Sequence, residues 1–280
     1  MILFIGLIIG LILGLTGAGG SIFAVPLLLF FLKLPLTDAV GIALGAIAIT
    51  ASYGTLNNLR SRSILWPQGL LLAGTGALVA PLGKWLGGLL PPLLLLSLFT
   101  ALATLIAIRM WHQSTANPEQ TTLVRAKSTE SSNFQQPACR MSITGQFQWR
   151  PRCIGSLALG GLLVGLTSGL LGVGSGFLIV PLLLFLNQVS LSQAISTSLL
   201  IIALVSGSGF ASYLVTDPDI QWSLLWLITA GGIAGMMTGQ LLSEKIAGPT
   251  LQKTFSSCLI IIVFLTLAHQ ISLSIPGVFS

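Results

Sequence analysis

Two short stretches of this sequence combine glycines with hydroxyl residues inside long apolar runs. They comprise Thr16, Gly17, Gly19, Gly20 and Ser21, and Ser168, Gly172, Gly174, Ser175 and Gly176. Each stretch leads directly into an apolar segment with the pattern of a helix. A helix that starts there presents unpaired backbone N–H groups and the positive end of its dipole, and glycine lets a ligand approach that backbone closely. Two such helix starts facing one cavity would bind an anion without any charged side chain.

Close helix packing is the alternative explanation for these glycines, because small residues also let helices approach each other in lipid. The duplication favours a binding site. The second stretch repeats the first at an offset of 155 positions, and both continue into Pro-Leu-Leu-Leu-Phe, at Pro26 and Pro181. Such self-similarity indicates a tandem repeat. We expect two homologous halves, residues 1–111 and 153–280, joined by a polar linker, residues 112–152.

The composition is that of a protein that lies in a lipid bilayer. Of the 280 residues, 54% are hydrophobic and 6% are charged, whereas about 25% of the residues in a soluble domain are charged. The apolar runs are continuous rather than alternating, which favours helices over strands. We therefore predict an all-α, polytopic membrane protein.

The first apolar run, residues 2–34, is too long for one straight crossing. A helix of that length would extend about 50 Å, whereas the hydrocarbon core is about 30 Å thick. The glycines must break this run into two shorter helices, and the same holds for residues 154–187. Each half then consists of a broken segment plus three transmembrane helices. These are predicted at about 38–58, 66–88 and 92–111, and at about 191–214, 221–243 and 250–269.

The loop charges bear on how the two halves are oriented. If each broken segment crosses the membrane, the halves are parallel; if each is a re-entrant hairpin, the halves are inverted. The basic linker belongs in the cytoplasm by the positive-inside rule. The inverted arrangement then places Lys245 and Lys253 inside and Asp217 and Asp219 outside, which obeys the rule better. We therefore predict inverted repeats, with two glycine-rich tips near the membrane midplane.

Four further polar residues are candidates for lining a transport pathway. Asn57, Asn58 and Thr197 lie near predicted helix ends, where capping is an alternative role. Lys84 lies within a turn of its helix end. Its ammonium could attract an anionic substrate or extend to the membrane surface.

Catalysis has little support in the sequence. Ser175 stands beside glycines, but neither His112 nor His269 lies at a mid-membrane position that suits a general base. No acidic residue lies in the middle of a predicted helix, which argues against a cation transporter or a proton relay. We expect no catalytic residue, metal site, cofactor or nucleic-acid partner. The coupling ion and the oligomeric state stay open. The alternatives are a structural or sensory membrane protein and a transporter of a different small anion.

The paired motifs, on a chain of this length, resemble the TauE/SafE family of sulfite and organosulfonate exporters. The resemblance covers both halves and leaves out only the linker. Its residues are Gly17, Gly19, Gly20 and Pro26, and Gly172, Gly174, Gly176 and Pro181. It implies a multi-pass permease of the inner (plasma) membrane for a small sulfur-containing anion such as sulfite, sulfoacetate or another sulfonate. Ser175 departs from the glycine run, which bears on the choice of substrate.

Overall fold

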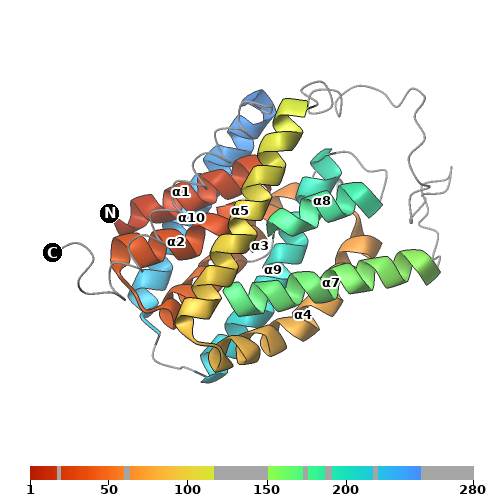
Figure 1. Cartoon of the computed structure of the whole chain (residues 1–280). Coiled ribbons are helices and arrows are strands. Elements are labelled where there is room, and N and C mark those ends of the chain that lie inside the picture. The colour runs from red at the N-terminus through yellow and green to blue at the C-terminus, as the bar shows by residue number, and fades with distance from the viewer. Residues whose placement is uncertain are drawn as a thin grey trace.

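The computed structural model describes most of both halves of the chain. The described residues are 1–17, 20–59, 64–116, 151–172, 176–186, 191–216 and 220–246. Every regular element within them is an α-helix (Figure 1). The first half contains α1 (Ile2–Thr16), α2 (Gly20–Leu32), α3 (Leu36–Leu59), α4 (Trp66–Leu89) and α5 (Pro92–Ala116). The second half contains α7 (Pro151–Leu171), α8 (Gly176–Leu186), α9 (Leu191–Thr216) and α10 (Trp222–Ile246).

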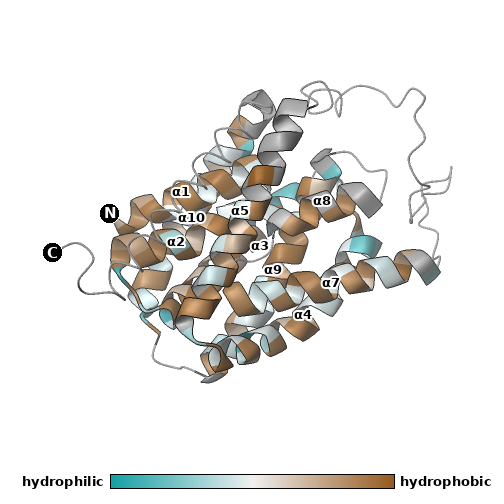
Figure 2. Cartoon of the chain, viewed as in Figure 1, coloured by the Kyte–Doolittle hydropathy of each residue, from teal (hydrophilic) through white to brown (hydrophobic). Residues whose placement is uncertain are grey.

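The helices have the length and composition of membrane spans. Within the described part of the chain, five helices are long and apolar enough to cross a bilayer: α3, α4, α7, α9 and α10. Apolar residues run along most of the bundle (Figure 2). Large apolar side chains such as Leu78 and Trp226 lie exposed on its outside, where lipid rather than water suits them. The predicted all-α membrane fold is confirmed.

The predicted breaks are present, but they are shorter than the glycine runs. In the first half α1 continues through Thr16 and α2 begins at Gly20. At the linker, α5 extends past residue 111 to Ala116, since no proline interrupts the helix before Pro118. The predicted final helix at 250–269 lies outside the described residues.

A close interface between the halves joins α1 to α10. A Cβ on any of three glycines of α1 would meet backbone oxygens of α10. The contacting pairs are Gly6 and Ile228, Gly10 and Gly232, and Gly14 and Met236. Because both members of each pair advance together, the two helices are parallel. Such close backbone approach stabilises helix pairs in lipid through van der Waals contact.

A second interface, between α4 and α7, has the same construction. Glycines of α7 lie against backbone oxygens of α4, and the contacting pairs are Gly161 and Leu72, Gly165 and Gly76, and Gly169 and Ala80. These helices are therefore also parallel. The pair Gly10 and Gly232 of the first interface corresponds to Gly165 and Gly76 here, at offsets of 155 and 156. Each half thus contributes its broken segment to one interface and its fourth helix to the other.

The central helices α3 and α9 run in opposite directions. The contacting pairs are Gly41 and Tyr213, Gly45 and Phe210, and Gly54 and Leu199. Helix α9 is parallel to α4: the Leu65 N–H donates to Thr197 at their starts, and Lys84 donates to the Ser212 carbonyl at their ends. Helix α3 is parallel to α10, as Gly45 contacts Leu225 and Asn57 contacts Gln240.

These directions determine what each broken segment does. Helices α1 and α3 run the same way, because both are parallel to α10. Only residues 33–35 separate α2 from α3, so α2 must return the chain to the end of the bundle where α1 begins. Helices α1 and α2 accordingly lie side by side in Figure 1. By the same reasoning α8 reverses α7, and each broken segment is a helical hairpin.

Helices at corresponding positions of the two halves therefore point in opposite directions: α1 and α7, α3 and α9, α4 and α10. We name the two ends of the bundle after Lys84 of α4 and Gln240 of α10, which correspond at an offset of 156. The Lys84 end holds the start of α3 and the ends of α4, α7 and α9. The Gln240 end holds the end of α3, the ends of α1 and α10, and the starts of α4, α7 and α9.

Cysteines placed after α3 and at the end of α9 should react from opposite sides of the membrane. Thr216 ends α9 at the Lys84 end, and Leu59, two positions before Ser61 in the sequence, ends α3 at the Gln240 end. The measurement is labelling of Ser61→Cys and Thr216→Cys by an impermeant thiol reagent, in cells and in inverted vesicles, after replacement of the three native cysteines. We expect Ser61→Cys to react from the cytoplasmic side. Reaction of both from one side would contradict the arrangement.

Candidate functional site: two glycine turns and the helix starts behind them

Each hairpin turns at a glycine in the left-handed backbone conformation. Gly17 has φ 69° and its N–H donates to the Leu13 carbonyl over 2.8 Å. Gly172 has φ 68° and its N–H donates to the Ser168 carbonyl over 2.9 Å. Glycine adopts this conformation without the steric penalty that a Cβ imposes, and it commonly ends helices in this way. One such residue is enough to stop each helix.

Each turn packs against the opposite half of the protein. A Cβ on Gly17 would meet Ile195 of α9, and one on Gly172 would lie 2.5 Å from Val40 of α3. Val40 and Ile195 themselves correspond at the offset of 155. In addition, the buried Ser198 hydroxyl donates to the Gly17 carbonyl over 2.8 Å. Both turns are therefore held by the central helices of the other half.

The helices that follow the turns begin inside the protein. Gly20 and Ser21 at the start of α2 are buried, and so is Gly176 at the start of α8. Gly20 lies against the backbone of Ile9 and Leu13, so α2 starts beside the middle of α1. Helices α2 and α8 also contact each other. Both helix starts, with the N–H groups and positive dipole ends that such starts carry, are thus buried in the interior.

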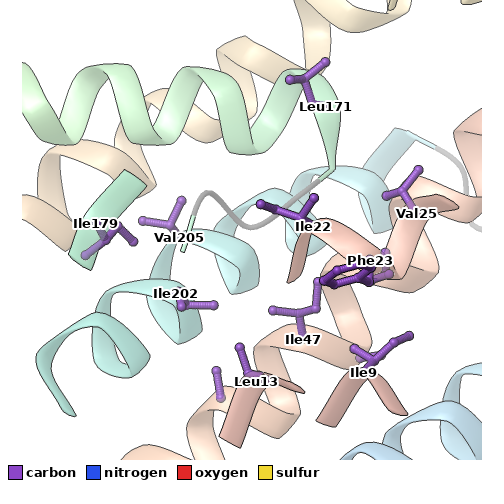
Figure 3. Packing of buried hydrophobic residues seen from close by; sticks show 14 of the residues in the cluster. Ile9, Leu13, Ile22, Phe23, Val25, Ile47, Leu171, Ile179, Ile202 and Val205 are labelled. Atoms are coloured by element: carbon purple, nitrogen blue, oxygen red, sulfur yellow. The ribbon is translucent and has the colours of Figure 1, made fainter. Parts of the chain in front are cut away.

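The surroundings of these helix starts are apolar. Figure 3 shows buried apolar side chains from these helices and their neighbours, among them Ile22 and Phe23 of α2, Ile47 of α3, Ile179 of α8 and Val205 of α9. Small-molecule sites typically have such apolar walls with a few polar groups that fix orientation. Exclusion of water also strengthens the interaction between helix dipoles and a charge.

Ser168 supplies an unsatisfied polar group beside the second turn. Its side chain is fully buried, and its hydroxyl oxygen has no hydrogen-bond partner among the described residues. Buried hydroxyls are normally paired, and an unpaired one costs about 1–3 kcal/mol. The hydroxyl lies one helical turn before Gly172, where a bound anion could accept its proton. Two more buried oxygens without partners are those of the Gln68 amide and the Ser206 hydroxyl.

Other predicted site residues make contacts within the protein. The Thr16 hydroxyl donates to the Ile12 carbonyl of its own helix over 2.7 Å. Thr197 accepts the Leu65 N–H over 3.0 Å, which joins the starts of α9 and α4. Asn58 is half-buried at the end of α3. Gly19, Gly174 and Ser175 lie outside the described residues.

Polar contacts join helices at both ends of the bundle. Lys84 Nζ donates to the Ser212 carbonyl over 3.0 Å and lies 4.8 Å from the centroid of the Tyr213 ring. The Tyr213 hydroxyl donates to Asp38 Oδ1 over 3.2 Å. At the other end, Asn57 Nδ2 donates to Gln240 Oε1 over 2.8 Å. Asn57 and Lys84 are therefore far apart along the bundle and do not line one site.

Sequence reasoning did not select Gln240 or Ser198. The repeat offers a signal for Gln240, since it lies 156 positions after Lys84 and is polar within an apolar helix. Ser198 replaces an alanine, Ala43, at the corresponding position of the first half. Comparing the two halves position by position for polar residues inside apolar helices would have found both.

Comparison with known proteins gives one family and several relatives. The sequence matches the family described as "Sulfite exporter TauE/SafE" over residues 2–266. A "Probable membrane transporter protein" of Xylella fastidiosa strain 9a5c is 30% identical over 248 residues, which cover 86% of this chain and 83% of the relative. "Probable membrane transporter protein YdhB" of Bacillus subtilis is 25% identical over 244 residues, 85% of this chain and 88% of the relative. No solved structure matches at a significant level.

Proposed function

Because the chain belongs to the TauE/SafE family and is a multi-pass membrane transporter, we propose that it is a permease for a small sulfur-containing anion. Sulfite, sulfoacetate and other sulfonates are the candidate substrates, and the inner membrane is the proposed location. The family's description supports the substrate class. The single structural observation that carries the site is the buried Ser168 hydroxyl beside the second turn, which has no hydrogen-bond partner in the part of the chain that the structure describes.

In this proposal the anion is bound by backbone rather than by salt bridges. The N–H groups at the starts of α2 and α8 donate to its oxygens, and the Ser168 hydroxyl adds one more donor. A helix start stabilises a nearby anion by about 0.3–1 kcal/mol when exposed and up to about 2 kcal/mol when partly buried. Because such a site has no charged side chain, it needs no counterion when the substrate is absent. This suits a carrier that must release its substrate.

Transport follows from the arrangement of the halves. We propose that they are inverted repeats, so that a motion that opens the Lys84 end has a matching motion that opens the Gln240 end. The two helical hairpins, each held by the other half, would move with the central helices they touch. The substrate then stays at the helix starts while access alternates between the two sides.

Uptake of labelled anions by proteoliposomes tests the proposal. Sulfite and sulfoacetate should enter, and chloride and sodium should not. The same anions should raise the melting temperature of the detergent-solubilised protein, since a ligand at 100 times its dissociation constant stabilises by about 2.7 kcal/mol. Neither uptake nor stabilisation by any member of the panel would refute an anion permease and favour a structural or sensory role.

Replacing Ser168 with alanine separates binding from folding. Without ligand, Ser168→Ala should be at least as stable as the native protein, because the variant no longer buries an unpaired hydroxyl. Its affinity for the anion should fall about fivefold, the equivalent of about 1 kcal/mol for one hydrogen bond. Melting curves with and without sulfite measure both effects. Unchanged affinity would exclude Ser168 from the site.

A further inference from the structure

Lys84 and Gln240 occupy equivalent places at the two ends of the bundle. They correspond at an offset of 156, one on α4 and the other on α10. Each has its backbone against the last turn of the broken helix from the opposite half. A Cβ on Gly169 would lie 2.9 Å from the Lys84 nitrogen, and one on Gly14 would lie 3.0 Å from the Gln240 nitrogen.

The partners of these two residues are equivalent as well. Lys84 contacts Ser212 and Tyr213 of α9, and Gln240 contacts Asn57 of α3. Ser212 and Asn57 correspond at an offset of 155. The same offset relates Tyr213 to Asn58 and Asp38 to Gln193. At these three positions the Lys84 end has a lysine, an aspartate and a tyrosine. The corresponding residues of the Gln240 end are all amides: Gln240, Gln193 and Asn58.

We propose that Lys84 attracts and orients the substrate anion at its end of the pathway and is the residue that makes the two ends unequal in affinity. This inference rests on the proposed anion permease. The lysine is next to the second glycine turn, since its backbone lies against Gly169, the neighbour of Ser168. An ammonium is a compact point charge that binds oxyanions in several orientations, which suits a residue that passes its ligand onward.

Two contacts of Lys84 hold its ammonium beside the end of α9. Two of the groups that Lys84 contacts, the Ser212 carbonyl and the Tyr213 ring, are neutral, and a cation–π contact stabilises an ammonium without removing its charge. Asp38, the carboxylate of the cluster, is reached through the Tyr213 hydroxyl. It lies in the first turn of α3, where the helix dipole already stabilises a negative charge.

A reciprocal exchange of the two residues tests the inference. The variants are Lys84→Gln, Gln240→Lys and the double exchange, reconstituted in proteoliposomes whose orientation is measured by labelling Thr216→Cys. The native protein should have a lower KM for labelled sulfite from the Lys84 end. Lys84→Gln should raise that KM by about tenfold, as loss of one charge-assisted contact predicts. The double exchange should reverse the asymmetry, so that the Gln240 end has the lower KM.

Lys84→Arg is the matched control, because it keeps the charge and should keep the asymmetry. Melting temperatures show which variants fold. Should Lys84→Gln fail to fold, Gln240→Lys alone decides, since it must lower the KM at the Gln240 end. An active native protein whose KM changes at neither end, or equally at both, would overturn the role of Lys84 and leave the permease intact. Absence of anion transport by the native protein would instead refute the proposed function.

Discussion

Replacing Gly165 with leucine should eliminate most of the folded protein. A Cβ at this position would overlap the Gly76 backbone of α4, and backbone cannot move aside as a flexible side chain can. Overpacking of a tight interface costs about 1–3 kcal/mol and sometimes more, which is a large part of the about 5–15 kcal/mol that stabilises a typical protein. The measurement is the yield of monodisperse protein in size-exclusion chromatography, followed by its melting temperature.

Gly155→Leu is the control in the same helix. A Cβ on Gly155 would meet no atom within 4 Å, so the substitution adds the same volume to α7 without a clash. This variant should match the native protein in yield and melting temperature. An equal loss of yield and melting temperature in both variants would show that leucine harms α7 for another reason. A native yield and melting temperature for Gly165→Leu would contradict the close α4–α7 interface.

Replacing Ser21 with aspartate should abolish transport, whereas replacing it with asparagine of similar size should not. Ser21 is fully buried in the first turn of α2, where the proposed substrate binds. A carboxylate there competes with the substrate for the same helix dipole and repels it. Two like charges 4 Å apart repel by about 4 kcal/mol at an effective dielectric constant of 20, roughly a thousandfold in binding. The measurement is initial uptake of labelled sulfite per reconstituted protein.

Asparagine controls for the size of the new side chain. Both variants crowd the start of α2 equally, so a role in packing alone predicts equal flux from Ser21→Asp and Ser21→Asn. Melting temperatures must first show that both are folded. Near-native flux from both folded variants would refute the anion site at α2.

The helices and the positions of both breaks could be predicted because the signals are local. Apolar length identifies the spans, and a single positive-φ residue is enough to end a helix, which glycine alone adopts at little cost. The same fact explains why the first break is shorter than the glycine run. Once Gly17 has turned the chain, Gly20 can begin α2, and Thr16 stays helical with its hydroxyl on the Ile12 carbonyl.

The pairing of α1 with α10 could not be predicted in the same way. Glycines four residues apart on α1 indicate a face for close packing, but nothing local tells which helix fills it. The same limit applies to the site. Ser168 is buried without a partner among the described residues, and Lys84 lies over Tyr213; both facts depend on atoms from helices distant in sequence. Residue type alone marked both as candidates without showing their surroundings.

Locating a heavy analogue of the substrate tests the central claim most directly. Selenite has the charge and shape of sulfite, and its selenium gives an anomalous signal in crystals of the native protein. We predict one strong peak at the starts of α2 and α8, with selenite oxygens at hydrogen-bond distance, about 2.7–3.2 Å, from backbone nitrogens there and from the Ser168 hydroxyl. In a protein that transports sulfite, a peak remote from both helix starts would contradict the account.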